Sequence, residues 1–148
     1  MQFAEVEVDT KTGQVRVLKI VAVHDCGRPM NRLTLRSQIN GGIIQGLSYA
    51  LFEDRLLDPK SGRMLNPNFE KYKVAGALDM PLIETHIIDV YNGSNNTGTV
   101  GIGEPATVPT AAAIANAVYN AIGARVYELP ITPARVLEAI EKSKETRR

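Results

Sequence analysis

Cysteine, tryptophan and net charge of either sign are scarce in this sequence, and each shortage excludes a class of protein. Cys26 is the one cysteine among 148 residues, which excludes an intramolecular disulfide framework and any metal site built from several cysteines of this chain. A net charge of +1 does not indicate the basic surface that binds nucleic acid or an anionic membrane. Tryptophan is absent and aromatic residues make up 5%, so a platform for stacking nucleic-acid bases is not expected either.

Long hydrophobic runs are missing as well. No apolar run approaches the roughly 20 residues that a membrane span requires. The first five residues lack the charged and apolar regions of a secretory signal. Together with the lone cysteine, these features predict a reducing, cytoplasmic setting.

Hydrophobic periodicity predicts an α+β fold in a single domain, 1–148. Apolar and charged residues alternate over 3–9, and a second alternating stretch, 15–23, follows turn-forming residues, which is typical of a β-hairpin with one solvated face. The remaining patterns predict strands at 82–90 and 125–129 and helices at 34–54, 110–122 and 133–142. We expect mostly antiparallel strands packed against these helices. The hairpin begins almost at residue 1 without a cap, which suggests that the chain starts inside a larger fold.

A glycine-rich loop, 97–105, precedes the most helix-prone stretch of the chain. Three glycines within six residues free the backbone for close approach by another group, and Glu104 follows the last of them. The helix predicted over 110–122 would place its positive N-terminal end nearby, ahead of a stop at Gly123. Two explanations stay open: a turn with a carboxylate that complements the helix dipole, or a site for an anionic ligand. The glycine order differs from the dinucleotide-binding fingerprint.

A second informative pattern lies in the helix predicted over 34–54. Ile39, Ile43 and Leu47 form an apolar stripe, and Gln38 and Gly42 lie on a neighbouring one. Each glycine in a helix interior costs about 1 kcal/mol relative to alanine, so something should require the space. Close packing against another element is one explanation, and a bulky cofactor lying over the glycines is the other.

The sequence His24-Asp25-Cys26 raises the question of a metal site. Adjacent residues on an extended chain point in opposite directions and cannot chelate one ion together, so no metal site is predicted here. Cys26 is expected to be a small buried hydrophobe, and Asp25 and Asn31 to tie the loop by side-chain to backbone hydrogen bonds. His86 alternates onto the polar side of its strand and is predicted to lie at the surface.

Three motifs together resemble one enzyme family. Gly101-Ile102-Gly103-Glu104-Pro105 is preceded by His24-Asp25-Cys26-Gly27-Arg28 and by Gln38-Ile39-Asn40-Gly41-Gly42, in the order found in the molybdenum-binding subunit of the xanthine dehydrogenase/aldehyde oxidase family. Gln38 precedes Glu104 by 66 residues, which is close to the family spacing. The resemblance covers nearly the whole chain and identifies it as the C-terminal portion of the molybdopterin-binding catalytic domain.

The resemblance implies a hydroxylase that oxidises an aldehyde or an aromatic N-heterocycle, with water as the oxygen source. Glu104 matches the general base, and the residues matching cofactor contacts are Gln38, Gly101, Ile102 and Gly103. No residue matches a direct metal ligand. The implied cofactor is molybdenum–molybdopterin, with the cytosine dinucleotide form as one candidate, and iron–sulfur clusters and FAD would lie in partner chains or domains.

The implied partners are the remainder of the molybdenum subunit, the iron–sulfur and flavin subunits or domains, and a small-molecule substrate, with a homodimer as one candidate arrangement. Four positions depart from the usual family pattern: Arg32, Asn40, Ala75 and Val100 stand where the family often has Pro, Glu, Pro and Lys. Two other function classes stay open from the residues alone. The chain could be a structural domain of a larger complex, or a stand-alone module that binds a small anion at the N-terminus of the 110–122 helix.

Overall fold

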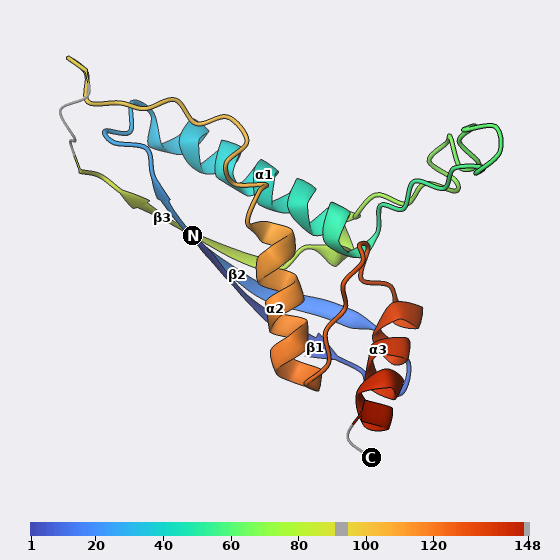
Figure 1. Cartoon of the computed structure of the whole chain (residues 1–148). Coiled ribbons are helices and arrows are strands. Elements are labelled where there is room, and N and C mark those ends of the chain that lie inside the picture. The colour runs from blue at the N-terminus through green and yellow to red at the C-terminus, as the bar shows by residue number, and fades with distance from the viewer. Residues whose placement is uncertain (91–94, 147–148) are drawn as a thin grey trace.

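A three-stranded sheet is covered by helices in the computed structural model, which describes residues 1–90 and 95–146 (Figure 1). The elements in chain order are β1 (Gln2–Val8), β2 (Val15–Asp25), α1 (Arg32–Leu51), a short 3-10 helix η1 (Ala77–Asp79), β3 (Leu82–Ile88), α2 (Thr110–Ile122) and α3 (Pro133–Thr146). The predicted α+β class and the three long helices are confirmed.

The sheet is mixed rather than mostly antiparallel as predicted, with the order β1-β2-β3. β1 and β2 form the predicted hairpin, whereas β2 and β3 pair in parallel, from Lys19 opposite Leu82 to Asp25 opposite Ile88. A parallel pair requires a crossover connection, and here it contains α1 followed by the segment 53–80, part of which extends as a green loop away from the sheet (Figure 1). The two parallel strands therefore end at the same edge of the sheet.

The core lies between β2 and the helices. Ile20 and Ala22 of β2 are fully buried, together with the predicted apolar stripe of α1, which comprises Ile39, Ile43, Leu47 and Ala50. Ile114 and Val118 of α2 and Val136 of α3 complete it. The buried residues of α1 recur at helical spacing, as the predicted apolar stripe requires.

One predicted strand is absent, and several predicted ends shift by a few residues: α1 spans Arg32–Leu51 rather than 34–54, and β3 ends at Ile88 rather than at 90. The segment 125–129 is not a strand, because it forms no ladder with the sheet, and Tyr127 is 89% exposed. A strand forms only where a partner edge accepts the backbone hydrogen bonds. The last helix continues past residue 142 to Thr146, and an ion pair between Glu138 and Lys142 at 2.5 Å supports its final turns.

Three helix ends carry capping contacts, and the predicted stop at Gly123 and the predicted side-chain to backbone bonds of Asn31 are confirmed. Asn31 caps α1, since its Oδ1 accepts hydrogen bonds from the N–H groups of Leu33 and Thr34 at 3.0 and 3.1 Å. α2 ends at Gly123, which adopts the left-handed conformation at φ 68°. Ahead of α3, Thr132 Oγ1 accepts from the N–H of Arg135 at 3.3 Å.

The glycines of α1 meet different surroundings, and they separate the two explanations for the stripe. A Cβ added at Gly42 would lie 2.8 Å from the Cβ of Ala106, and one at Gly46 would lie 2.6 Å from the Cβ of Thr110. Gly42 and Gly46 therefore allow α1 to pack closely against the segment 106–110. The alternative, a cofactor lying over Gly42, is wrong, because protein atoms fill that space. A Cβ at Gly41 meets nothing within 4 Å.

The same substitution should therefore have opposite effects at two positions of one helix. Gly41→Ala is expected to raise the free energy of unfolding by about 0.5–1 kcal/mol, because it gains helix propensity in open space. Gly46→Ala should lower it by about 1–3 kcal/mol despite the same gain, because the new methyl group overlaps Thr110. Urea unfolding of both variants measures the difference; a stabilised Gly46→Ala would contradict the close packing.

Candidate functional site

The glycine loop lies against the first half of α1, and two predicted site residues meet there. Gln38 Nε2 donates a hydrogen bond of 2.8 Å to the carbonyl oxygen of Gly103, across 65 positions of sequence. Glu104 is the next residue in the chain. Gln38 thus fixes the backbone immediately before the predicted base, and both side chains are exposed on this chain.

The upstream half of the loop pairs with the segment that follows β2. The N–H of Arg28 donates to Gly98 O at 2.8 Å, and the N–H of Val100 donates to Cys26 O at 2.9 Å. Gly27 lies between them at φ 61°, and a Cβ there would stand 2.2 Å from Gly98 O. Only glycine fits this crossing. The 24–28 motif is therefore joined by backbone hydrogen bonds to the part of the glycine loop that directly precedes the 101–105 motif.

Glu104 is separated from the N-terminus of α2 by a turn. The N–H of Thr107 donates to Glu104 O at 2.9 Å, and the helix starts only at Thr110. The idea that Glu104 complements the dipole in the first turn of α2 is therefore wrong, because the effect is confined to the terminal turn. The carboxylate is instead presented outward from a loop that is held on both sides.

A concavity of about 320 Å³ adjoins this loop, between the 26–31 segment and the first turns of α1. Gln38 and Ile102 line it, together with Arg28, Asn31 and Val100. Arg28 was not predicted as a site residue from the sequence, where it appeared only as the last residue of one motif. Added Cβ atoms at Gly101 and Gly103 meet nothing within 4 Å, so the loop backbone is open to a ligand.

These residues suit part of a large polar ligand. The amide of Gln38 lines the concavity, and the loop that Gln38 contacts offers exposed backbone at Gly101 and Gly103 and the carboxylate of Glu104. The volume is at the lower end of the roughly 300–1,000 Å³ typical of small-molecule sites, and it is open. The chain thus supplies one wall of a site rather than an enclosure.

Comparisons with known proteins agree with this geometry. Residues 1–81 match the molybdopterin cofactor-binding domain family. The chain belongs to this family. The matched region includes Gln38 but ends before Glu104.

Relatives extend the similarity beyond residue 81. The chain is 38% identical over 136 residues, 92% of its length, to the xanthine dehydrogenase molybdenum-binding subunit of Escherichia coli O157:H7. It is 38% identical over 139 residues, 93% of its length, to the aldehyde oxidoreductase molybdenum-binding subunit PaoC of Escherichia coli K12. It covers only 18% and 19% of those two proteins.

A solved structure shares the fold. The crystal structure of quinoline 2-oxidoreductase from Pseudomonas putida 86 superposes with a TM-score of 0.85 at 30% identity, over 93% of this chain and 18% of that chain. The resemblance to the xanthine dehydrogenase/aldehyde oxidase family is thus confirmed, and the chain corresponds to less than a fifth of these relatives' length.

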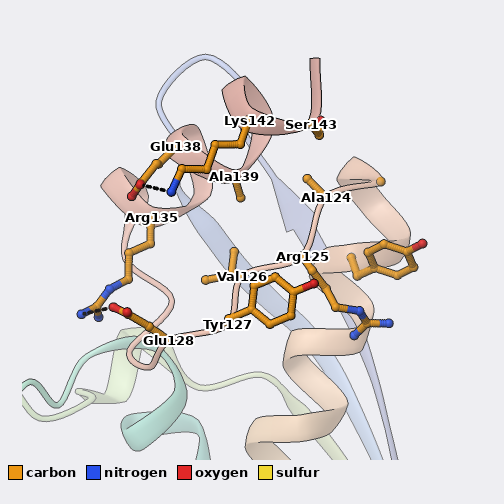
Figure 2. Close-up of a pocket in the computed structure, with 12 residues that line it drawn as sticks. Ala124, Arg125, Val126, Tyr127, Glu128, Arg135, Glu138, Ala139, Lys142 and Ser143 are labelled. Carbon is orange, nitrogen blue, oxygen red and sulfur yellow. Dashed lines mark ion pairs between the residues drawn. The ribbon is translucent and has the colours of Figure 1, made fainter. Parts of the chain in front are cut away.

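Another concavity lies between the end of α2, the segment 124–128 and α3 (Figure 2). Its volume is about 610 Å³, and none of the predicted site residues lines it. Its cations are engaged: Arg135 pairs with Glu128 at 3.4 Å, Lys142 with Glu138 at 2.5 Å, and Arg125 stacks over the Tyr119 ring at 4.2 Å. Family membership therefore directs attention to the glycine loop instead.

Among residues 1–90 and 95–146, no group of three His, Cys, Asp or Glu side chains could hold a metal ion. Cys26 is buried, as predicted, and Asp25 accepts a hydrogen bond from the N–H of Gly27 at 3.1 Å. Burial, with the nearby charges of Asp25 and Asp89, raises the pKa of the Cys26 thiol and keeps it protonated.

His86 is exposed, as predicted. No helix in the described part of the chain is long and apolar enough to cross a membrane.

His24 is the buried titratable group beside this region. It is only 7% exposed, and its Nε2 has no hydrogen-bond partner within the described ranges. Burial, followed by the positive charge of the N-terminus, lowers the pKa of the imidazole below its ordinary value of 6.5. The folded chain therefore holds His24 neutral where the unfolded chain would already bind a proton.

This difference predicts a pH dependence of stability. As pH falls from about 6.5 towards the lowered pKa, the unfolded state takes up a proton that the folded state does not, so the free energy of unfolding should decrease. His24→Met should flatten that part of the curve, measured as melting temperature between pH 7.5 and 5. The exposed His86→Met is the matched control and should keep the wild-type slope; equal flattening in both variants would contradict the assignment.

Proposed function

We propose that this chain forms one wall of the active site of a molybdenum hydroxylase and supplies its general base. The chain would be the C-terminal portion (1–148) of the catalytic domain. The reaction proposed is oxidation of an aldehyde or an aromatic N-heterocycle, with water as the oxygen source. The observation that carries this proposal is the contact between Gln38 and Gly103, which joins two family-like motifs next to Glu104. The names of the relatives, a xanthine dehydrogenase and an aldehyde oxidoreductase, support the reaction class.

Glu104 has the properties that a general base needs. Its carboxylate is exposed on this chain, so a substrate or a water molecule can reach it, while Gln38 holds the preceding carbonyl. A base must lie within hydrogen-bond reach of the proton that it removes, so a fixed backbone favours the reaction. Glu104 would take the proton from the attacking oxygen nucleophile.

The cofactor would lie across the exposed loop. Contacts to it would come from Gln38, from Ile102 and from the backbone of Gly101 and Gly103. The space beside these two glycines is open, because a Cβ there would meet nothing within 4 Å. When bound, the molybdenum–molybdopterin group supplies the redox chemistry that accepts two electrons from the substrate carbon. The residues of this chain bind and orient the reactants and accept the proton.

The proposal also includes partners that this chain does not contain. Electrons would leave through iron–sulfur clusters and FAD on other chains or domains, and the rest of the molybdenum subunit would enclose the cofactor. The cytosine dinucleotide form is one candidate for the cofactor, and a homodimer is one candidate assembly. The names of both relatives describe a molybdenum-binding subunit, which supports a multi-subunit enzyme.

Replacing the base tests the proposal directly. In the complete enzyme, Glu104→Gln should keep the molybdenum content and lower turnover by at least about 10²-fold, the usual scale for losing general-base catalysis. Metal analysis and steady-state kinetics with an aldehyde and a purine measure both. Glu141→Gln, on the exposed side of α3, is the matched control. Wild-type turnover in metal-loaded Glu104→Gln would leave the chain a structural domain.

The 148-residue chain on its own is expected to hold no molybdenum cofactor and to oxidise neither substrate. One open wall of about 320 Å³ cannot bury most of a pterin and its phosphate tail, as small-molecule sites typically do. Elemental analysis of the purified chain, after expression in cells that make the cofactor, gives the answer. Stoichiometric molybdenum with measurable turnover would contradict the proposed dependence on the rest of the subunit.

A further inference from the structure

A buried polar cluster lies on the inner side of the loop that carries Glu104. Gln2 is 8% exposed, and Ala106 and Thr110 are fully buried. Gln2 Nε2 donates to the carbonyl oxygen of Ala106 at 2.6 Å. Thr110 Oγ1 donates to Gln2 Oε1 at 2.7 Å and lies 2.9 Å from the same Ala106 oxygen. The first strand, the loop and the first residue of α2 are thus joined by one amide and one hydroxyl.

The donor and acceptor roles in this cluster are fixed. The carbonyl of Ala106 can only accept, so the Gln2 amide must turn its NH₂ group toward it and its oxygen toward Thr110. That oxygen also only accepts, so the Thr110 hydroxyl must supply the hydrogen. Each group requires the other two, and no alternative arrangement satisfies the buried atoms equally well.

Gln38 and this cluster hold the backbone on the two sides of Glu104. Gln38 holds Gly103 O on the upstream side, and Gln2 holds Ala106 O two residues downstream of Glu104. Between these points the N–H of Thr107 closes the turn onto Glu104 O. The opposite side of 106–110 rests on Gly42 and Gly46 of α1. The backbone of Glu104 is therefore held from β1 and from α1, while its side chain faces outward.

We infer that Gln2 and Thr110 are positioning residues for Glu104, acting through the Ala106 carbonyl. The inference rests on the proposed role of Glu104 as the general base. Neither residue reaches the exposed face, so neither touches substrate or cofactor. Their effect is to hold the carboxylate at a set position, where a displacement of about 1 Å can reduce turnover about 10²-fold.

Thr110→Val tests this in the complete, molybdenum-loaded enzyme, because it keeps the side-chain shape and removes the hydroxyl. Hydrogen exchange of peptides spanning 103–109 should rise at least about 5-fold, since a local opening becomes easier. The value of kcat should fall about 10-fold with KM within about 2-fold, as expected for loss of alignment rather than of binding. Thr110→Ser restores the hydroxyl and should restore both values.

Thr85→Val is the matched control. It also removes a threonine hydroxyl that donates to a side chain, Asn40 Oδ1 at 3.0 Å, but Thr85 lies on β3 and its hydrogen-bond partner lies on α1 rather than in 103–110. Its exchange in 103–109 should match wild type. If Thr110→Val fails to assemble, Gln2→Met replaces it, since it removes both contacts of the amide at similar side-chain length.

The double variant separates the two proposals. If Thr110 acts through Glu104, Thr110→Val should change the residual rate of Glu104→Gln by less than about 2-fold, because residues acting as one unit are not additive. An equal, additive loss in both backgrounds, or wild-type exchange in Thr110→Val, overturns the positioning role while leaving Glu104 as the base. Unchanged turnover in Glu104→Gln alone overturns the proposed function itself, and the positioning role with it.

Discussion

The close contact between α1 and the segment 106–110 is the constraint on which the site depends. Gly42 and Gly46 remove two side chains from one face of the helix, and Ala106 and Thr110 occupy that space. The same helix carries Gln38 one turn earlier, which reaches Gly103. This one packing contact therefore positions both the glycine loop on the core and the Gln38 amide beside the loop. The polar cluster at Gln2 completes the same arrangement from the sheet side.

The parallel pairing of β2 and β3 brings the two loop motifs together. β2 ends at Asp25 and β3 at Ile88, opposite one another, so the chain leaves both strands at the same edge. The segments that follow then meet through the Gly27–Thr99 bridge. In α/β sheets, ligands commonly bind beyond the carboxyl ends of parallel strands, and this small mixed sheet places its candidate site in the equivalent position.

Much of this structure could be predicted from local pattern, and the parts that could not share one physical cause. Ile39, Ile43 and Leu47 repeat at helical spacing, and Gly123 is typical of a helix end, so the body of α1 and the end of α2 were located from sequence. The strand direction of β3 and the irregular path of 125–129 depend on which edges are available in three dimensions, and periodicity carries no such information. Tyr127, for example, lies in a predicted strand but on a segment that has no partner strand.

The site shows the same division. The family-like motifs identified Gln38, the glycines and Glu104, but not Gln2 or Thr110, whose residue types are ordinary in a strand and at a helix start. Their role follows only from the three-dimensional cluster. A loop held this firmly also has a consequence for ligand binding. Because the backbone of 103–110 is already ordered by the core, a ligand that docks on it would lose little conformational entropy of the protein there. This part of the chain then behaves as a preformed template for a ligand.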